Sequence, residues 1–284
     1  MASHNVAHNL RDAKAERDCD VESGRTESHS NSQANLNAGA PLNRQISVQL
    51  SNEQYERLFL QTGGVGASKG DAAKRFGNPT PLGLASFLLC LTPFACNLMG
   101  FAGTTSSAAA TTVGAFYFIG GVGSYVAGIL EWVLGNTFPA TVFCTFGGLW
   151  LSFAFLLSPT EGIAQALGPT SVDYNAGIAL FFVWWAVLTL IYLMAALRTN
   201  LVFVMVFFFL DIAFWLLVAT YFCVAKGLVA KIPMLLQASG AFCFLTAACG
   251  WYLMLVLTLG ATGFPLALPV GDMSGFLARK PKQS

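Results

Sequence analysis

The sequence predicts an all-α membrane protein with six transmembrane helices per protomer, and three observations support this prediction. Hydrophobic residues make up 55% of the 284-residue chain and charged residues only 10%, whereas soluble domains carry about 25% charged residues. More than half of the charges lie in residues 1–75. The rest of the chain, up to about residue 275, is divided into six apolar runs, as expected of a segment that crosses a bilayer repeatedly.

The six runs lie at about 81–100, 112–134, 137–158, 176–197, 201–224 and 233–259. Each is close to the roughly 20 residues that a helix needs to cross the hydrocarbon core. Lys and Arg residues precede the first run, separate the fourth from the fifth and follow the sixth. Because positive residues favour the cytoplasmic side, we expect both termini in the cytoplasm, although Lys226 and Lys231 lie on the opposite side.

The chain divides into three predicted parts. Residues 1–75 form a cytoplasmic tail that is mostly disordered, because few large apolar side chains are present, with a short amphipathic helix possible at 51–62. Residues 76–272 form a six-helix transmembrane transport domain, and 273–284 form a short basic cytoplasmic tail. The N-terminus lacks the apolar core of a secretory signal, so we expect the first span to direct membrane insertion.

The distribution of reactive side chains argues against an enzyme. The three histidines (His4, His8 and His29) lie in the polar tail, and the cysteines form no CxxC pair. The spans contain neither a nucleophile paired with a base nor metal-ligand spacing. We therefore predict no catalytic residue, no metal and no cofactor, and the lack of a basic cluster predicts no nucleic-acid partner.

The first span opens on the polar and proline-rich sequence GNPTPLG. In one interpretation Asn78 caps the helix and Pro79 occupies its first position. In the other, a helix that starts at membrane depth offers free N–H groups and a positive dipole end to a carboxylate. The second interpretation makes Asn78, Pro79 and Thr80 candidate substrate-binding residues. Phe87 lies about 13 Å deeper by helix rise and could plug a narrow path.

Two acidic residues lie within apolar runs, where an ionisable group costs at least about 2.5 kcal/mol at the bilayer centre. Asp211 is expected to face the bundle interior, either as a proton carrier or as a hydrogen-bonded structural residue. Glu131 is a second proton-coupling candidate, and its alternatives are a structural charge that snorkels at the helix end and a partner for Arg198. Small residues around Gly120 and Gly128 predict close helix packing, inside the bundle or between subunits.

The motif NPTPLGL (78–84) resembles the NPxPLGL signature of the acetate uptake transporter family. This family includes bacterial succinate–acetate permeases and fungal acetate and ammonia-export proteins. Three further segments resemble family segments in the same order: LEWVLGNTFP (130–139), FGGLWLSF (146–153) and VFFFLDIAFWLL (206–217). The resemblance covers residues 77 to 272.

The resemblance implies a six-helix protomer with its own pore, assembled with identical copies into a hexameric ring. It also implies a constriction of Phe, Tyr and Leu, which corresponds here to Phe87, Phe146 and Leu210. Phe146 departs from the family pattern, because it keeps the ring but lacks the tyrosine hydroxyl. Asp211 is a second departure, since the bacterial pattern has Thr at that position.

Together these features predict a multi-pass plasma-membrane transporter for acetate and related short monocarboxylates, which move in symport with a proton. The long polar tail indicates a fungal protein, because the bacterial members of the family have almost no tail. An exporter of ammonia or ammonium is the first alternative, because related proteins are linked to that role and carboxylates or aromatic faces favour a cation. A membrane sensor or scaffold that transports nothing is the second alternative.

Overall fold

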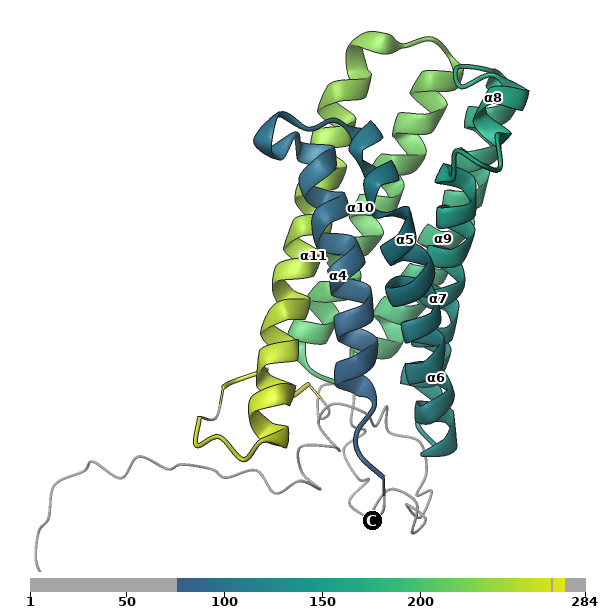
Figure 1. The fold of residues 1–284 in the computed structure, drawn as a ribbon. Coiled ribbons are helices and arrows are strands. Elements are labelled where there is room, and N and C mark those ends of the chain that lie inside the picture. The colour runs from purple at the N-terminus through teal and green to yellow at the C-terminus, as the bar shows by residue number, and fades with distance from the viewer. Residues whose placement is uncertain (1–75, 267, 274–284) are drawn as a thin grey trace, which may run out of the picture. The chain divides into compact units, whose positions relative to one another are not determined.

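The computed structural model describes residues 76–266 and 268–273, and these residues form a bundle of long helices (Figure 1). The elements are α4 (Thr80–Met99), η1 (Phe101–Gly103), η2 (Ser106–Thr112), α5 (Val113–Ala115), η3 (Phe116–Gly123), α6 (Ser124–Val133), α7 (Thr137–Leu157), α8 (Ile163–Leu167), α9 (Val172–Ala196), α10 (Leu201–Ala225), η4 (Val229–Lys231) and α11 (Ile232–Ala261). The predicted N-terminal tail, the helix expected at 51–62 and residues 274–284 lie outside the described residues.

Six helical stretches of the described chain are long and apolar enough to cross a membrane, which confirms the predicted fold class. Four of them are α4, α7, α9 and α10, and the other two are the composite stretches 106–133 and 229–261. The fourth span begins at Val172, earlier than its apolar run predicts. Ser171 caps it by accepting a hydrogen bond from the Tyr174 N–H at 3.2 Å, so polar residues extend the helix beyond the hydrophobic stretch.

The second span is not a continuous α-helix. It begins as the 3₁₀ helix η2, passes through α5, widens into the π-helix η3 and ends as α6. The widened turns place Gly120 against the indole of Trp150 on α7, where an added Cβ would lie 2.7 Å from the indole Cγ. The π-helix and its glycine therefore make room for a large side chain from a neighbouring helix.

The small residues of the second span pack against helices of the same chain. A Cβ added at Gly123 would meet the Ser86 hydroxyl of α4 at 2.4 Å, and one added at Gly128 would meet the Cys144 sulfur of α7 at 2.4 Å. Backbones can approach this closely only where side chains are missing. Packing inside the bundle, one of the two roles predicted for the small residues around Gly120 and Gly128, is confirmed.

Gly147 on α7 offers a direct test of this packing. Its added Cβ would lie 3.0 Å from the Gly121 carbonyl oxygen and 3.2 Å from the Tyr125 backbone nitrogen. Because backbone atoms cannot rotate away, Gly147→Ala should lower the unfolding temperature in detergent, at a cost of about 1–3 kcal/mol. Gly177→Ala on α9 is the matched control: nothing lies within 4 Å of its Cβ, and alanine favours helix by about 1 kcal/mol. Equal unfolding temperatures for the two variants would contradict the packing described here.

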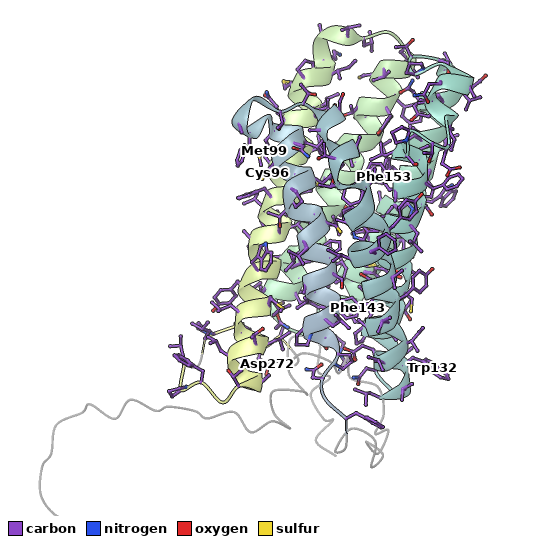
Figure 2. All side chains as sticks on the ribbon, viewed as in Figure 1. Cys96, Met99, Trp132, Phe143, Phe153 and Asp272 are labelled. Carbon is purple, nitrogen blue, oxygen red and sulfur yellow. The ribbon has the colours of Figure 1, made fainter. Side chains whose placement is uncertain are left out.

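Alternate spans run in opposite directions, so α4, α7 and α10 all begin at one end of the bundle, here called the Asn78 end. In Figure 2, Trp132 and Asp272 lie toward this end, whereas Cys96 and Met99 of α4 lie toward the other. Figure 2 also places Phe143 nearer the Asn78 end than Phe153 of the same helix. Residues at similar distances from the starts of these three helices therefore lie at similar depth.

The segment that follows α11 folds back to the start of α10, at the Asn78 end (Figure 1). The Leu201 N–H donates to the Gly271 carbonyl at 2.7 Å. The Asn200 side-chain oxygen accepts from the Phe203 N–H at 2.9 Å. The first turn of a helix has N–H groups without partners inside the helix, and here the chain itself supplies acceptors for them.

Candidate functional site

Glu131 joins three parts of the chain at the Asn78 end. Its side chain is 0% exposed. The Thr80 hydroxyl at the start of α4 donates to Oε1 at 2.5 Å, and the Asn136 side-chain amide donates to Oε2 at 2.7 Å. Both carboxyl oxygens thus accept hydrogen bonds, as a buried carboxylate requires. Glu131 does not snorkel toward solvent, as one alternative assumed, because these partners hold it inside the bundle.

Asn78 lies just before Pro79, the residue at the N-cap position of the first helix, and so does not itself occupy the cap position. Its side-chain oxygen accepts from the Thr80 N–H at 2.9 Å. The helix itself begins at Thr80, with Pro79 just before it and Pro81 in the first turn. The capping interpretation expects Pro79 to be the first residue of the helix, but Pro79 lies one residue before the helix begins. The binding of a carboxylate at this helix end stays a prediction.

Phe87, Phe146 and Leu210 meet inside the bundle, as the motif resemblance implies. They lie within the first three turns of α4, α7 and α10, which begin at the same end, and all three line one cavity. The ring centroids of Phe87 and Phe146 are 5.4 Å apart in an edge-to-face arrangement. We call these three residues the collar.

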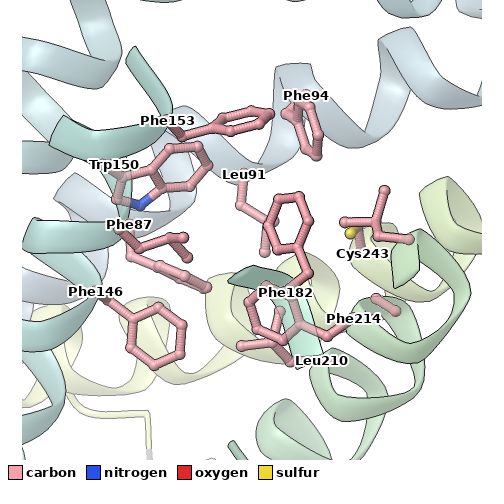
Figure 3. A pocket seen from close by; sticks show the side chains of 13 residues that line it. Phe87, Leu91, Phe94, Phe146, Trp150, Phe153, Phe182, Leu210, Phe214 and Cys243 are labelled. Carbon is pink, nitrogen blue, oxygen red and sulfur yellow. The ribbon is translucent and has the colours of Figure 1, made fainter. Parts of the chain in front are cut away.

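The central cavity extends from the collar away from the Asn78 end (Figure 3). Its volume is about 40 Å³, room for about three water-sized spheres. The exposed surface of its lining consists of apolar atoms and includes no charged residue, and the indole N–H of Trp150 does not reach that surface. The lining residues are Phe87, Leu91, Phe94, Phe146, Leu149, Trp150, Phe153, Phe182, Leu210, Ala213, Phe214, Leu217 and Cys243.

A smaller cavity of about 10 Å³, here called the smaller cavity, lies on the Asn78 side of the collar. It is lined by Thr80, Phe138, Pro139, Val142, Phe143, Phe203, Leu253 and Leu257. Thr80 lies two turns before Phe87 on α4, and Phe143 lies one turn before Phe146 on α7. The collar therefore lies between two cavities within one protomer, and Thr80 connects the smaller cavity to Glu131.

Asp211 follows Leu210 in the chain but is not among the cavity-lining residues. Successive residues of a helix are rotated by about 100°, so the two side chains leave α10 in different directions. Asp211 is half-buried beside Phe208 and Trp215, which are 48% and 44% exposed. Its Oδ1 has no hydrogen-bond partner in the described part of the chain. Asp211 thus does not line the central cavity, but its Oδ1 is buried, and the expectation that it faces the bundle interior stays a prediction.

The motif analysis named three of the cavity-lining residues and missed the others, among them Trp150, Phe182 and Phe214. The missed positions on the collar helices could have been found from helical spacing. Trp150 lies four residues after Phe146, and Phe214 lies four residues after Leu210. Phe182 comes from α9, and only the tertiary fold brings it to the cavity. Within the described residues, no group of three or more His, Cys, Asp or Glu side chains could hold a metal ion.

Known proteins resemble this chain both in fold and in sequence. The solved structure of the bacterial acetate channel SatP superposes with a TM-score of 0.56 at 27% identity, covering 69% of this chain and 99% of that one. Protein alcS of Aspergillus fumigatus is 39% identical over 245 residues, 82% of this chain and 88% of alcS. Acetate permease A of Emericella nidulans is 35% identical over 192 residues, 66% of this chain and 63% of the permease. Other relatives, from Saccharomyces cerevisiae, are named ammonia transport outward proteins. The chain belongs to the GPR1/FUN34/yaaH family, whose model matches residues 63–275.

Proposed function

We propose that this protein transports acetate and related short monocarboxylates across the plasma membrane, with both termini in the cytoplasm. The observation that carries the proposal is the collar between two cavities inside one six-helix protomer. The likeness to a solved acetate channel and to an acetate permease supports it. A narrow apolar passage requires its cargo to lose water, which favours small molecules with few polar atoms.

The lining of the central cavity supports proton coupling. A carboxylate ion without a charged partner is costly in an apolar space, whereas the protonated acid is neutral. We therefore propose that the proton crosses the collar bound to the substrate. Uptake then rises as the external pH falls, because a larger fraction of the substrate is protonated.

The Asn78 end is the proposed cytoplasmic mouth. There Asn78 and Pro79 precede α4, and Thr80, its first residue, lines the smaller cavity while it donates to Glu131. The buried Glu131 carboxyl also disfavours an anionic substrate near it, which again favours the neutral acid.

As the motif resemblance implies, we propose a homo-hexamer in which every subunit has its own transport pathway.

Uptake of radiolabelled acetate by lipid vesicles containing the purified protein tests this function. Protein-containing vesicles should take up acetate faster than empty ones, which correct for passive diffusion of acetic acid. Lowering the external pH below the internal pH should increase this difference severalfold. Uptake equal to that of empty vesicles at every pH would refute acetate transport.

Ammonia export is the second candidate, supported by the relatives named for outward ammonia transport. Neutral ammonia would also tolerate the apolar lining of the central cavity. Vesicles loaded with ammonium separate the two functions. Release of ammonia above the empty-vesicle rate, without acetate uptake, would replace the first proposal by the second.

Asp211→Asn tests where the proton travels. Because Asp211 does not line the central cavity, we expect this variant to take up acetate with the same dependence on external pH as the unchanged protein. Asp173→Asn, at an exposed position in the first turn of α9, is the control. If Asp211→Asn alone abolished the pH dependence at equal protein abundance, Asp211 would carry the proton instead.

A further inference from the structure

The indole N–H of Trp150 is a buried donor without an acceptor. The side chain is 3% exposed, and its Nε1 has no hydrogen-bond partner among the described residues. A buried tryptophan N–H usually finds a partner. The ring is held firmly, since it packs on Gly120 of the π-helix and its centroid lies 4.8 Å from that of Phe116. The donor is therefore fixed in place although nothing in the described chain uses it.

This donor lies where the central cavity meets the collar. Trp150 lines the cavity, and in Figure 3 the nitrogen is on the side of the indole that faces Phe87. The centroids of these two rings are 6.3 Å apart, so Phe87 is a direct neighbour of the indole on its donor side. Cys243, another lining residue, carries a thiol, which is a weak donor and a weak acceptor.

A buried, unpartnered donor beside an apolar cavity fits a ligand with one acceptor oxygen and a short alkyl group. We infer that the Trp150 N–H donates to the carbonyl oxygen of a protonated short-chain monocarboxylic acid as the acid passes the collar. Phe87 uncovers the donor when its ring turns aside. The hydrogen bond replaces the one that a tyrosine hydroxyl would offer at Phe146. This inference rests on the proposed acetate transport and adds to it a binding residue and the protonation state of the ligand.

Trp150→Phe removes the donor and keeps an aromatic ring. In vesicles at acidic external pH, this variant should need about five times more acetate for half-maximal uptake, as expected for one lost hydrogen bond. Trp184→Phe is the matched control and should behave like the unchanged protein, because Trp184 is 71% exposed on α9. Adding Phe146→Tyr to Trp150→Phe should restore part of the affinity by supplying a hydroxyl. An unchanged half-saturating concentration in Trp150→Phe would overturn the inference.

A binding measurement on the unchanged protein covers the case in which Trp150→Phe does not fold. The chain has six tryptophans, so nitrogen-15 labelling gives six indole N–H signals in a magnetic resonance spectrum. Saturating acetate should shift an indole signal, and this signal should be missing from Trp150→Phe where that variant folds. If no indole signal moves while the vesicles still take up acetate, the inference fails and the proposed function stands. If uptake never exceeds that of empty vesicles, both fail.

Discussion

Replacing Glu131 by Ala is expected to lower the free energy of unfolding by about 3 kcal/mol, because two donors lose their acceptor inside the bundle. The Thr80 hydroxyl and the Asn136 amide both donate to this carboxyl group. Together they join the start of α4 to the end of α6 and to the turn before α7, so the Asn78 end should loosen first. Thermal unfolding of the purified protein in detergent, followed by tryptophan fluorescence, measures the effect.

Two controls make the Glu131 result specific. Glu161→Ala removes an exposed carboxylate from a loop and should leave the unfolding temperature unchanged. Glu131→Gln keeps the size and one acceptor oxygen, so it should unfold between Glu131→Ala and the unchanged protein. If Glu131→Ala unfolded at the temperature of the unchanged protein, the carboxyl group would not hold the three segments together.

Replacing Phe87 by Ala is expected to remove the size limit of the collar. The truncation would join the central cavity to the space around Thr80, and it would also cost about 3–5 kcal/mol of stability, as for other buried phenylalanines. Because a hydrophobic pocket discriminates about tenfold or more per methylene group, uptake of propionate, which has one methylene group more than acetate, should rise about tenfold relative to acetate. Uptake of both labelled acids by vesicles gives this ratio directly.

The control for the collar is Phe118→Ala, which truncates a phenylalanine that is 75% exposed on the π-helix. It should change neither the ratio of the two acids nor the unfolding temperature by much. If folded Phe87→Ala protein kept the acetate preference of the unchanged protein, selection by size would have to occur elsewhere in the route.

The fold was largely predictable from the sequence, because local signals determine where a membrane helix begins and ends. The fifth predicted span, 201–224, differs by one residue from α10, since the apolar run is long and Asn200 caps it. The irregular second span was not predictable. Its π-helix places Gly120 against the Trp150 indole, a contact between residues that are 30 positions apart in the chain and that no local pattern reveals.

The site was predictable only in part, because several of its contacts join residues that are far apart in the chain. Motif resemblance led to Phe87 and Leu210, and the structure brings both to the collar. The bond between Thr80 and Glu131 joins residues 51 positions apart, which neither periodicity nor composition can reveal. Asp211 follows Leu210 in the sequence but does not line the central cavity, because successive residues of a helix are rotated by about 100°.

The hydrogen bond between Gly271 and Leu201 has a consequence for biosynthesis. Gly271 leaves the ribosome only after all six spans have been made, so the first turn of α10 waits for the last part of the transport domain. A product that stopped translation just after α11 would carry every membrane span and still expose uncapped amides. Such a truncated product would offer cellular quality control a feature by which to distinguish it from a finished chain.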